Sequence, residues 1–162
     1  MKNSSVRPAD DIEIVVHTYA NTLYRLCLFM LGNESDAEDV VQETFIKYLK
    51  ETTEFKDAEH EKAWLITVAS NRCRDMLRFR KRHPQISLDF LQELSVNSSD
   101  SGILEAMVSL PEKFRIVLFL YYVEEYRIGD IAKIIGKTDS AVKMRLQKGR
   151  KILEKIYRKE YL

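Results

Sequence analysis

Apolar residues recur every three or four positions over three long stretches in the first half of the chain. This is the period of a helix that buries one side, and it predicts helices over about 12–31, 35–50 and 61–82. Gly32 ends the first of these, and Pro84 stops the third because proline cannot continue a helix. The first half is therefore expected to fold as three amphipathic helices.

The start of the second helix carries its own signal. Ser35 stands three residues before Glu38, which is the spacing of a capping box. Ser35 is accordingly expected to open this helix, with its side-chain oxygen accepting a backbone hydrogen bond.

Shorter apolar segments fill the second half, after a stretch at 84–102 that is rich in Ser, Asn and Asp, as linkers are. The spacing after it predicts a short helix at 103–109, another from about 111 through 121, a brief one at 128–135 and a final basic helix. With few Gly and Pro, the chain is expected to be all-α, with little or no sheet. Two small helical domains, 1–83 and 103–162, would be joined by a flexible linker at 84–102.

The segment 130–146, DIAKIIGKTDSAVKMRL, has the layout of a helix-turn-helix. Ala132 is small where the second helix must cross closely, Gly136 can adopt the positive φ of the turn, and Thr138 can cap the next helix. The opposite face of that helix carries side chains of the kinds that reach base edges and phosphates in a major groove. They are Asp139, Ser140, Lys143, Met144, Gln147 and Lys148, with Arg145, Arg150 and Lys151 placed to hold phosphate. Alone, this segment also fits an ordinary helical hairpin with a solvated basic face.

A formal net charge of +1 conceals a segregation of charge along the chain. Residues 34–43 carry five acidic and no basic side chains, 72–82 carry six basic and one acidic, and 143–159 carry eight basic and one acidic. Segments of opposite sign indicate more than one macromolecular partner, although each segment alone also fits a solvated helix face.

Membrane and enzyme functions find little support in the sequence. The start is polar and no apolar run approaches the roughly 18 to 20 residues that span a bilayer, so we expect a cytoplasmic protein with no membrane insertion. Cys27 and Cys73 stand far apart in apolar contexts and are expected to be buried free thiols rather than a disulfide or a metal site. The three histidines are scattered and no Gly-rich phosphate loop occurs, so no catalytic residue, metal or cofactor is expected.

Three motifs occur in the order of one known family. They are LGNESDAEDVVQETF at 31–45, AWLI at 63–66 with ASNRCRDMLR at 69–78, and LPEKFRIVL at 110–118 ahead of the helix-turn-helix. From about residue 15 to 153 the chain resembles the extracytoplasmic-function (ECF) group of the sigma-70 family. The resemblance implies an alternative sigma factor that binds bacterial core RNA polymerase and directs promoter-specific transcription initiation, and that is not an enzyme. It also implies promoter DNA and an anti-sigma factor as partners of a monomeric protein.

The family pattern further implies roles for three sets of residues. An acidic helix that docks on core polymerase would present Asp36, Glu38, Asp39, Gln42, Glu43 and Phe45. The minus-ten promoter element would meet the loop before the third helix, which captures a flipped base, and that helix's polar stripe, at Phe55, Lys62, Asn71, Arg74, Asp75, Arg78 and Arg82. The minus-thirty-five element would meet Thr138, Asp139, Ser140, Lys143, Met144, Arg145, Gln147, Lys148 and Arg150. Trp64 is open between a core anchor and a base-stacking platform.

Three positions depart from the family pattern. Arg127 is a poor cap and Gly129 weakens the first turn of the helix at 128–135, which is therefore expected to fray or start late. Gly149 lies inside the last helix and is expected to let its end bend or loosen.

The main competing interpretation is a stand-alone helix-turn-helix regulator. Such a protein would bind palindromic half-sites as a dimer without needing polymerase. The acidic helix at 36–43 favours the sigma factor, because a stand-alone regulator has no need for it. A helical adaptor is a further alternative, since fold does not fix function.

Overall fold

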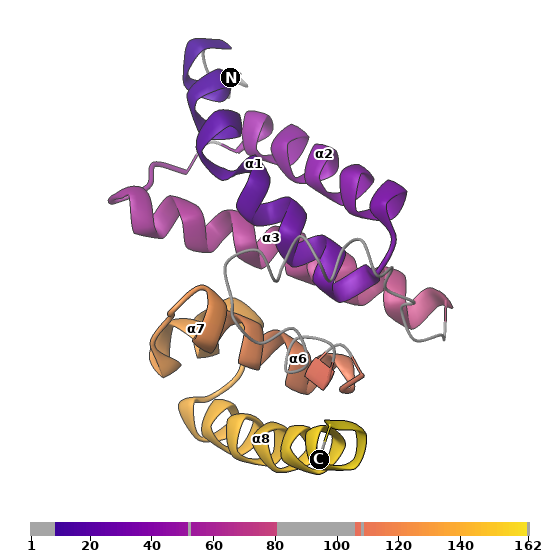
Figure 1. Cartoon of the computed structure of the whole chain (residues 1–162). Coiled ribbons are helices and arrows are strands. Elements are labelled where there is room, and N and C mark those ends of the chain that lie inside the picture. Colours follow the sequence, from indigo (N-terminus) through magenta and orange to yellow (C-terminus); the bar gives the residue numbers. More distant parts are fainter. Residues whose placement is uncertain (1–8, 52, 81–105, 108, 162) are drawn as a thin grey trace. The chain divides into compact units, whose positions relative to one another are not determined.

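Helices make up the regular structure of the described part of this chain. The fold is given by a computed structural model, which describes residues 9–51, 53–80, 106–107 and 109–161. Over these residues no strand occurs, and the chain divides into two compact units, Met1–Arg80 and Lys81–Leu162 (Figure 1). The predicted all-α class with two helical domains is confirmed, while the predicted linker at 84–102 and most of the short helix at 103–109 lie outside the described residues.

The first unit consists of α1 (Ala9–Leu31), α2 (Glu34–Lys50) and α3 (Ala58–Arg80). Each of these helices packs against the other two (Figure 1). Their apolar sides meet in one core that includes Leu23, Leu26, Phe29, Met30, Ala37, Val40, Tyr48, Leu65, Ile66 and Ala69. Both cysteines are buried in this unit and neither forms a disulfide, as predicted.

The apolar character of α1 extends further than the sequence analysis allowed. Residues Asp11–Leu31 are long and apolar enough to cross a bilayer by length and composition alone, so the expectation that no stretch approaches such a length was wrong. A core helix satisfies the same test. The apolar side of α1 lies against α2 and α3, with Leu23 and Leu26 each only 1% exposed, which identifies it as the core helix of this unit.

The turn between α1 and α2 takes only two residues. Gly32 adopts a φ of 67° and donates its N–H to the carbonyl of Leu28 at 2.8 Å, which ends α1. Asn33 then caps α2, with its Oδ1 accepting the N–H of Asp36 at 2.9 Å. The predicted cap at Ser35 is therefore wrong: α2 begins at Glu34, and Ser35 already lies within its first turn.

The second unit is built from α6 (Glu112–Leu118), the π-helix η1 (Phe119–Val123), α7 (Ile128–Ile135) and α8 (Asp139–Tyr161). Helix α8 packs against α6 and α7. The core includes Phe114, Ile116, Val117, Leu118, Phe119, Leu120, Ile131, Ile134, Val142 and Leu146. The predicted helix at 111–121 has the right place, but its last part widens into a π-helix that the apolar spacing did not indicate.

The helix-turn-helix forms as predicted. Gly136 has a φ of 67° at the end of α7, and the Oγ1 of Thr138 accepts the N–H of Ala141 at 3.1 Å at the start of α8. Helix α7 begins at Ile128 and its first turn closes, with the N–H of Ile131 donating to the carbonyl of Arg127 at 3.0 Å. Arg127 supplies no side-chain cap, as expected, but the predicted late start is wrong.

Gly149 is a packing residue rather than a weak point. Helix α8 runs through it without interruption, so the predicted bend or loosening is wrong. A Cβ at this position would lie 3.3 Å from the Cβ of Phe114 and 3.3 Å from the Cδ1 of Leu118. The missing side chain thus lets α8 approach α6 closely.

Gly149→Val is expected to destabilise the second unit by about 1–3 kcal/mol, because the added side chain would overpack the contact with α6. Gly129→Ala is a control of opposite sign. Its Cβ would meet only the Oδ2 of Asp139 at 4.0 Å, so replacing this glycine in the first turn of α7 should stabilise the helix by up to about 1 kcal/mol. Urea unfolding followed by helical circular dichroism measures both changes. Equal stability of Gly149→Val and the parent chain would show that α6 yields without cost.

Candidate functional site

The outward side of α2 is acidic and exposed. Glu38, Asp39, Gln42 and Glu43 are all exposed, while Ala37, Val40, Thr44 and Tyr48 of the same helix are buried. Asp36 is half-buried at the first turn, where a carboxylate also suits the helix dipole. The structure therefore brings together five of the six residues predicted for this face, on a helix whose other side is fixed in the core.

Phe45 is the exception in this set. Its side chain is 8% exposed and belongs to the core of the first unit, so its predicted place on the outward face is wrong. The helical period places residue 45 on the same side of α2 as the buried Ala37 and Tyr48 and the half-buried Val41, and this phase turns its side chain into the core.

Ile46 is an outward residue that the sequence analysis missed. It is 51% exposed, and it follows Asp39 by seven residues and Gln42 by four, which puts all three on one side of α2. The signal in the sequence was its phase, because an apolar residue out of step with the core period must face solvent or a partner. An apolar side chain thus stands among polar ones on the acidic face.

A polar stripe follows α3 along its exposed side. Asn71, Asp75 and Arg78 are exposed and Arg74 is half-buried. An Nη of Arg74 donates to the Oδ1 of Asn71, and Arg78 lies 3.9 Å from the carboxylate of Asp75. Arg82, the last residue predicted for this stripe, lies outside the described residues. The stripe presents cations, a carboxylate and an amide together, the mixture suited to phosphates and base edges.

An ion pair joins α3 to the acidic helix. The Nε of Arg72 donates to the Oε2 of Glu43 at 2.7 Å, and this hydrogen bond is the main reason that the pKa of Arg72 is raised. A surface groove surrounds the pair, lined by Glu43, Thr44, Lys47, Val68, Asn71, Arg72 and Asp75. The acidic face of α2 and the polar stripe of α3 therefore lie side by side along the groove. The sequence did not reveal this contact, because Glu43 and Arg72 are 29 positions apart.

Aromatic rings hold the loop before α3. The ring of Phe55 stacks on Tyr48 with centroids 6.0 Å apart and lies 5.8 Å from Trp64 and 5.3 Å from His60. Phe55 and Trp64 are both half-buried. The ring of Trp64 also meets that of Tyr48 edge to face, with centroids 6.1 Å apart. Trp64 therefore anchors this cluster, and the geometry favours a packing role for it.

Backbone hydrogen bonds fix the same loop. The N–H of Lys56 donates to the Nδ1 of His60 at 3.1 Å, and the N–H of His60 donates to the Oδ1 of Asp57 at 2.8 Å. Lys62, also predicted for this site, is half-buried in the first turns of α3. These hydrogen bonds therefore give the loop a defined conformation.

Tyr19 ties α1 to the start of α3. Its Oη donates to the carbonyl of Ala58 at 3.3 Å. Burial raises the pKa of Tyr19, and the nearby carboxylates of Glu61 and Glu59 raise it further. The phenol therefore keeps its proton, and its donated bond, throughout the neutral range.

Helix α8 presents the side chains predicted for a groove. The exposed ones are Asp139, Ser140, Lys143, Met144, Gln147, Lys148 and Arg150. Arg145 is only half-exposed, and the hydroxyl of Thr138 is engaged as the cap. Met144 is 65% exposed, a large apolar side chain on a basic face.

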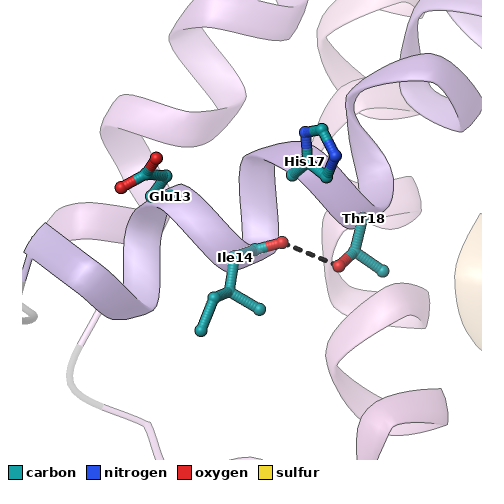
Figure 2. A pocket seen from close by; sticks show the side chains of 4 residues that line it. All are labelled: Glu13, Ile14, His17 and Thr18. Carbon is teal, nitrogen blue, oxygen red and sulfur yellow. Dashed lines mark hydrogen bonds between the residues drawn. The ribbon is translucent and has the colours of Figure 1, made fainter.

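One hollow lies apart from all of these residues. Glu13, Ile14, His17 and Thr18 of α1 line it, and the Oγ1 of Thr18 donates to the carbonyl of Ile14 at 2.7 Å (Figure 2). One helix supplies all four residues, and the single hydrogen bond drawn is internal to that helix. Within the described part of the chain, no group of three or more His, Cys, Asp and Glu side chains could hold a metal ion.

A helix-turn-helix in one helical unit and an outward acidic helix in the other are the features expected of a DNA-binding protein that also has a protein partner. The family model for sigma-70 region 2 matches residues 15–83, and that for sigma-70 region 4 matches residues 101–153. The chain is 31% identical to the ECF RNA polymerase sigma factor SigW of Bacillus subtilis (strain 168), over 87% of this chain and 86% of that protein. It is 29% identical to SigM of the same organism, over 90% of this chain and 94% of that protein. The chain belongs to the sigma-70 family, as an ECF-type alternative sigma factor that directs transcription.

Solved structures agree on the fold. The sigma factor RpoE of Bartonella quintana, in complex with the anti-sigma factor NepR, superposes with a TM-score of 0.70 over 94% of this chain and 99% of that chain. CnrH, in complex with the cytosolic domain of CnrY, superposes with a TM-score of 0.71 over 95% and 92%. Each is 19% identical to this chain, so the likeness establishes a shared fold. The stand-alone regulator is not favoured.

Proposed function

We propose that this chain binds core RNA polymerase through α2 and carries it to promoters that have both a minus-ten and a minus-thirty-five element. The observation that carries this proposal is the pairing of an exposed acidic helix with a helix-turn-helix in a separate unit. A stand-alone regulator would need only the second feature. The chain contributes binding energy to initiation and performs no catalysis, with no metal or cofactor.

The face of α2 fits a basic protein partner. This face offers carboxylates and an amide from Glu38, Asp39, Gln42 and Glu43. Ile46 adds apolar area among these polar side chains. Interfaces commonly place such an apolar contact inside a polar rim, where it loses its water on binding. Charge complementarity would speed the encounter and fix the register.

The first unit also reads the minus-ten element. Its loop, shaped by Phe55 and His60, offers ring edges for an unstacked base, and single-stranded recognition works through stacking and edge contacts. The α3 stripe then follows the strand, with Arg74 and Arg78 on phosphates and Asn71 or Asp75 nearer the bases. Arg82 would hold a further phosphate. Lys62 adds a cation beside the loop.

The second unit reads the minus-thirty-five element through α8. Lys143, Met144, Gln147 and Lys148 face base edges together with the first-turn residues Asp139 and Ser140, and Arg145 and Arg150 hold phosphate. Thr138 acts here through its cap, which fixes the angle at which α8 leaves the turn.

The whole chain would be organised as two domains and a linker. Domains at 1–83 and 103–162 would be joined by a flexible linker at 84–102, and the protein would be a cytoplasmic monomer. An anti-sigma factor would regulate it, as suggested by the similar Bartonella quintana sigma factor, which was solved with one. Such a regulator would need to mask two separate surfaces of the chain.

Transcription in vitro with bacterial core polymerase on fragmented genomic DNA tests this function. RNA starts that share a bipartite upstream element are expected when the chain is added. Tight DNA binding by the chain alone, with no starts in the presence of core polymerase, would support the stand-alone regulator instead.

Lys143→Ala and Gln147→Ala are each expected to change base preference in the minus-thirty-five element, because one well-placed base contact contributes about 1–3 kcal/mol of discrimination. Lys155→Ala removes a cation from an exposed position of the same helix outside the predicted set, and should leave the preference unchanged. Selection from a randomised minus-thirty-five library by each holoenzyme measures the preference. The same base profile from all variants would refute the assignment of base contacts to Lys143 and Gln147.

A further inference from the structure

Two adjacent tyrosines of η1 hold Arg150. The Nε of Arg150 donates a hydrogen bond to the Oη of Tyr122 at 2.6 Å. Its guanidinium carbon lies 5.6 Å from the ring centroid of Tyr122 and 5.7 Å from that of Tyr121. The two rings meet edge to face with centroids 4.9 Å apart. One hydrogen bond and two cation–π contacts therefore fix the direction of a long side chain.

The π-helix explains how two consecutive side chains reach one partner. Neighbours in an α-helix point about 100° apart, and the wider i→i+5 turn of a π-helix reduces this divergence. The turn is closed by the N–H of Glu124 donating to the carbonyl of Phe119 at 3.2 Å. Single π-helical turns are rare and occur frequently at functional sites.

The guanidinium that the tyrosines hold is not neutralised. Arg150 makes no ion pair with a carboxylate in the described parts of the chain, and its bond to Tyr122 uses one of its five N–H donors. The donors on Nη1 and Nη2 form a planar edge that fits two oxygens of a phosphate. Arg150 is exposed and Tyr122 is 53% exposed, so an anion can reach both.

Tyr122 adds a donor of its own. Its hydroxyl oxygen accepts the bond from Arg150, which leaves the hydroxyl hydrogen to be donated elsewhere. A phosphate beside Arg150 would receive this O–H bond together with the guanidinium bonds. The pair thus has the donor set of an anion clamp, with a full positive charge on one member.

The position of Arg150 on α8 indicates which anion it meets. Lys143, Gln147 and Arg150 are spaced i, i+4 and i+7, so they follow one side of the helix. We propose that Tyr122 and Arg150 clamp one backbone phosphate of promoter DNA beside the minus-thirty-five element. This inference rests on the proposed function, and it adds Tyr122 as a DNA-contacting residue that also positions Arg150.

Promoter binding by the holoenzyme over a salt series tests the clamp. Tyr122→Phe keeps the ring and removes the hydroxyl, and is expected to weaken promoter affinity about two- to tenfold. Arg150→Gln should weaken it further and lower the slope of log affinity against log salt by about 0.9, the value for one phosphate contact. Lys155→Gln removes a cation from an exposed position of α8 outside the predicted contacts, and should match the parent protein in affinity and salt slope. Circular dichroism melting shows whether each variant is folded.

Three results would overturn the clamp. Equal affinity and salt slope in all four proteins, with transcription starts intact, would do so and leave the proposed function standing. Loss of transcription by Tyr122→Phe at unchanged DNA affinity and salt slope would place a protein partner at Tyr122 instead. Absence of starts with the parent protein would remove the proposed function, and the clamp with it.

Discussion

Asp39→Arg is expected to lower the affinity of the chain for core RNA polymerase at least about 100-fold and to abolish promoter-dependent starts. Asp39 is exposed on the outward side of α2, near Gln42, Glu43 and Ile46. A cation there would oppose the basic surface that the acidic face is proposed to meet, and opposed like charges in an interface cost several kcal/mol. Titration of labelled chain with core polymerase gives the affinity, and run-off transcription gives the starts.

Glu13→Arg provides the matched control. It makes the same change of charge at an exposed position of α1, beside the hollow in Figure 2 and away from every predicted contact. Polymerase affinity close to that of the parent chain is expected. If both variants lose affinity equally, net charge rather than the face of α2 governs binding. If Asp39→Arg binds normally, α2 is not the docking helix.

Phe45→Ala is expected to reduce the free energy of unfolding of the first unit by about 3–5 kcal/mol, whereas Ile46→Ala should change it by less than about 0.5 kcal/mol. The two residues are neighbours on α2, but Phe45 is 8% exposed and Ile46 is 51% exposed. Truncating the first leaves a cavity between helices, and truncating the second removes area that water already covers. Chemical denaturation followed by circular dichroism measures both values.

The same pair separates a structural role from a contact role. Ile46→Ala is expected to weaken polymerase binding about tenfold while the chain keeps its stability. Phe45→Ala would reduce binding only through loss of the folded unit, so stabilising osmolyte should restore its binding but not that of Ile46→Ala. Similar stability of the two variants would contradict the burial of Phe45.

Periodicity predicted the helices well because burial of one helix side controls both the pattern and the fold. The helical period also puts Phe45 on the core side of α2, where the structure has it, whereas the family resemblance implied an outward place for this residue. Cap choice was harder. Ser35 and Asn33 are both good caps, and only the left-handed Gly32, which directs the chain into a two-residue turn, decides in favour of Asn33.

Contacts between residues far apart in the sequence could not be predicted from it. The ion pair between Arg72 and Glu43 joins positions 29 apart, and the bond between Arg150 and Tyr122 joins positions 28 apart. Gly149 shows the same limit. Helix propensity predicts that this glycine weakens α8, whereas in the fold it lets α8 approach α6 closely. Which side chains are exposed on α2 and α8 followed from the period, and what those side chains touch required the fold.

Separate cores give this protein a route for evolutionary change. Each unit buries its own apolar residues, so a substitution on the exposed face of α8 leaves the packing of α1, α2 and α3 as it was. New promoter sequences can then be explored one element at a time, without a loss of stability in the other unit. A lineage that duplicates such a chain can diversify its set of target genes by small steps on one surface while the rest of the molecule stays constant.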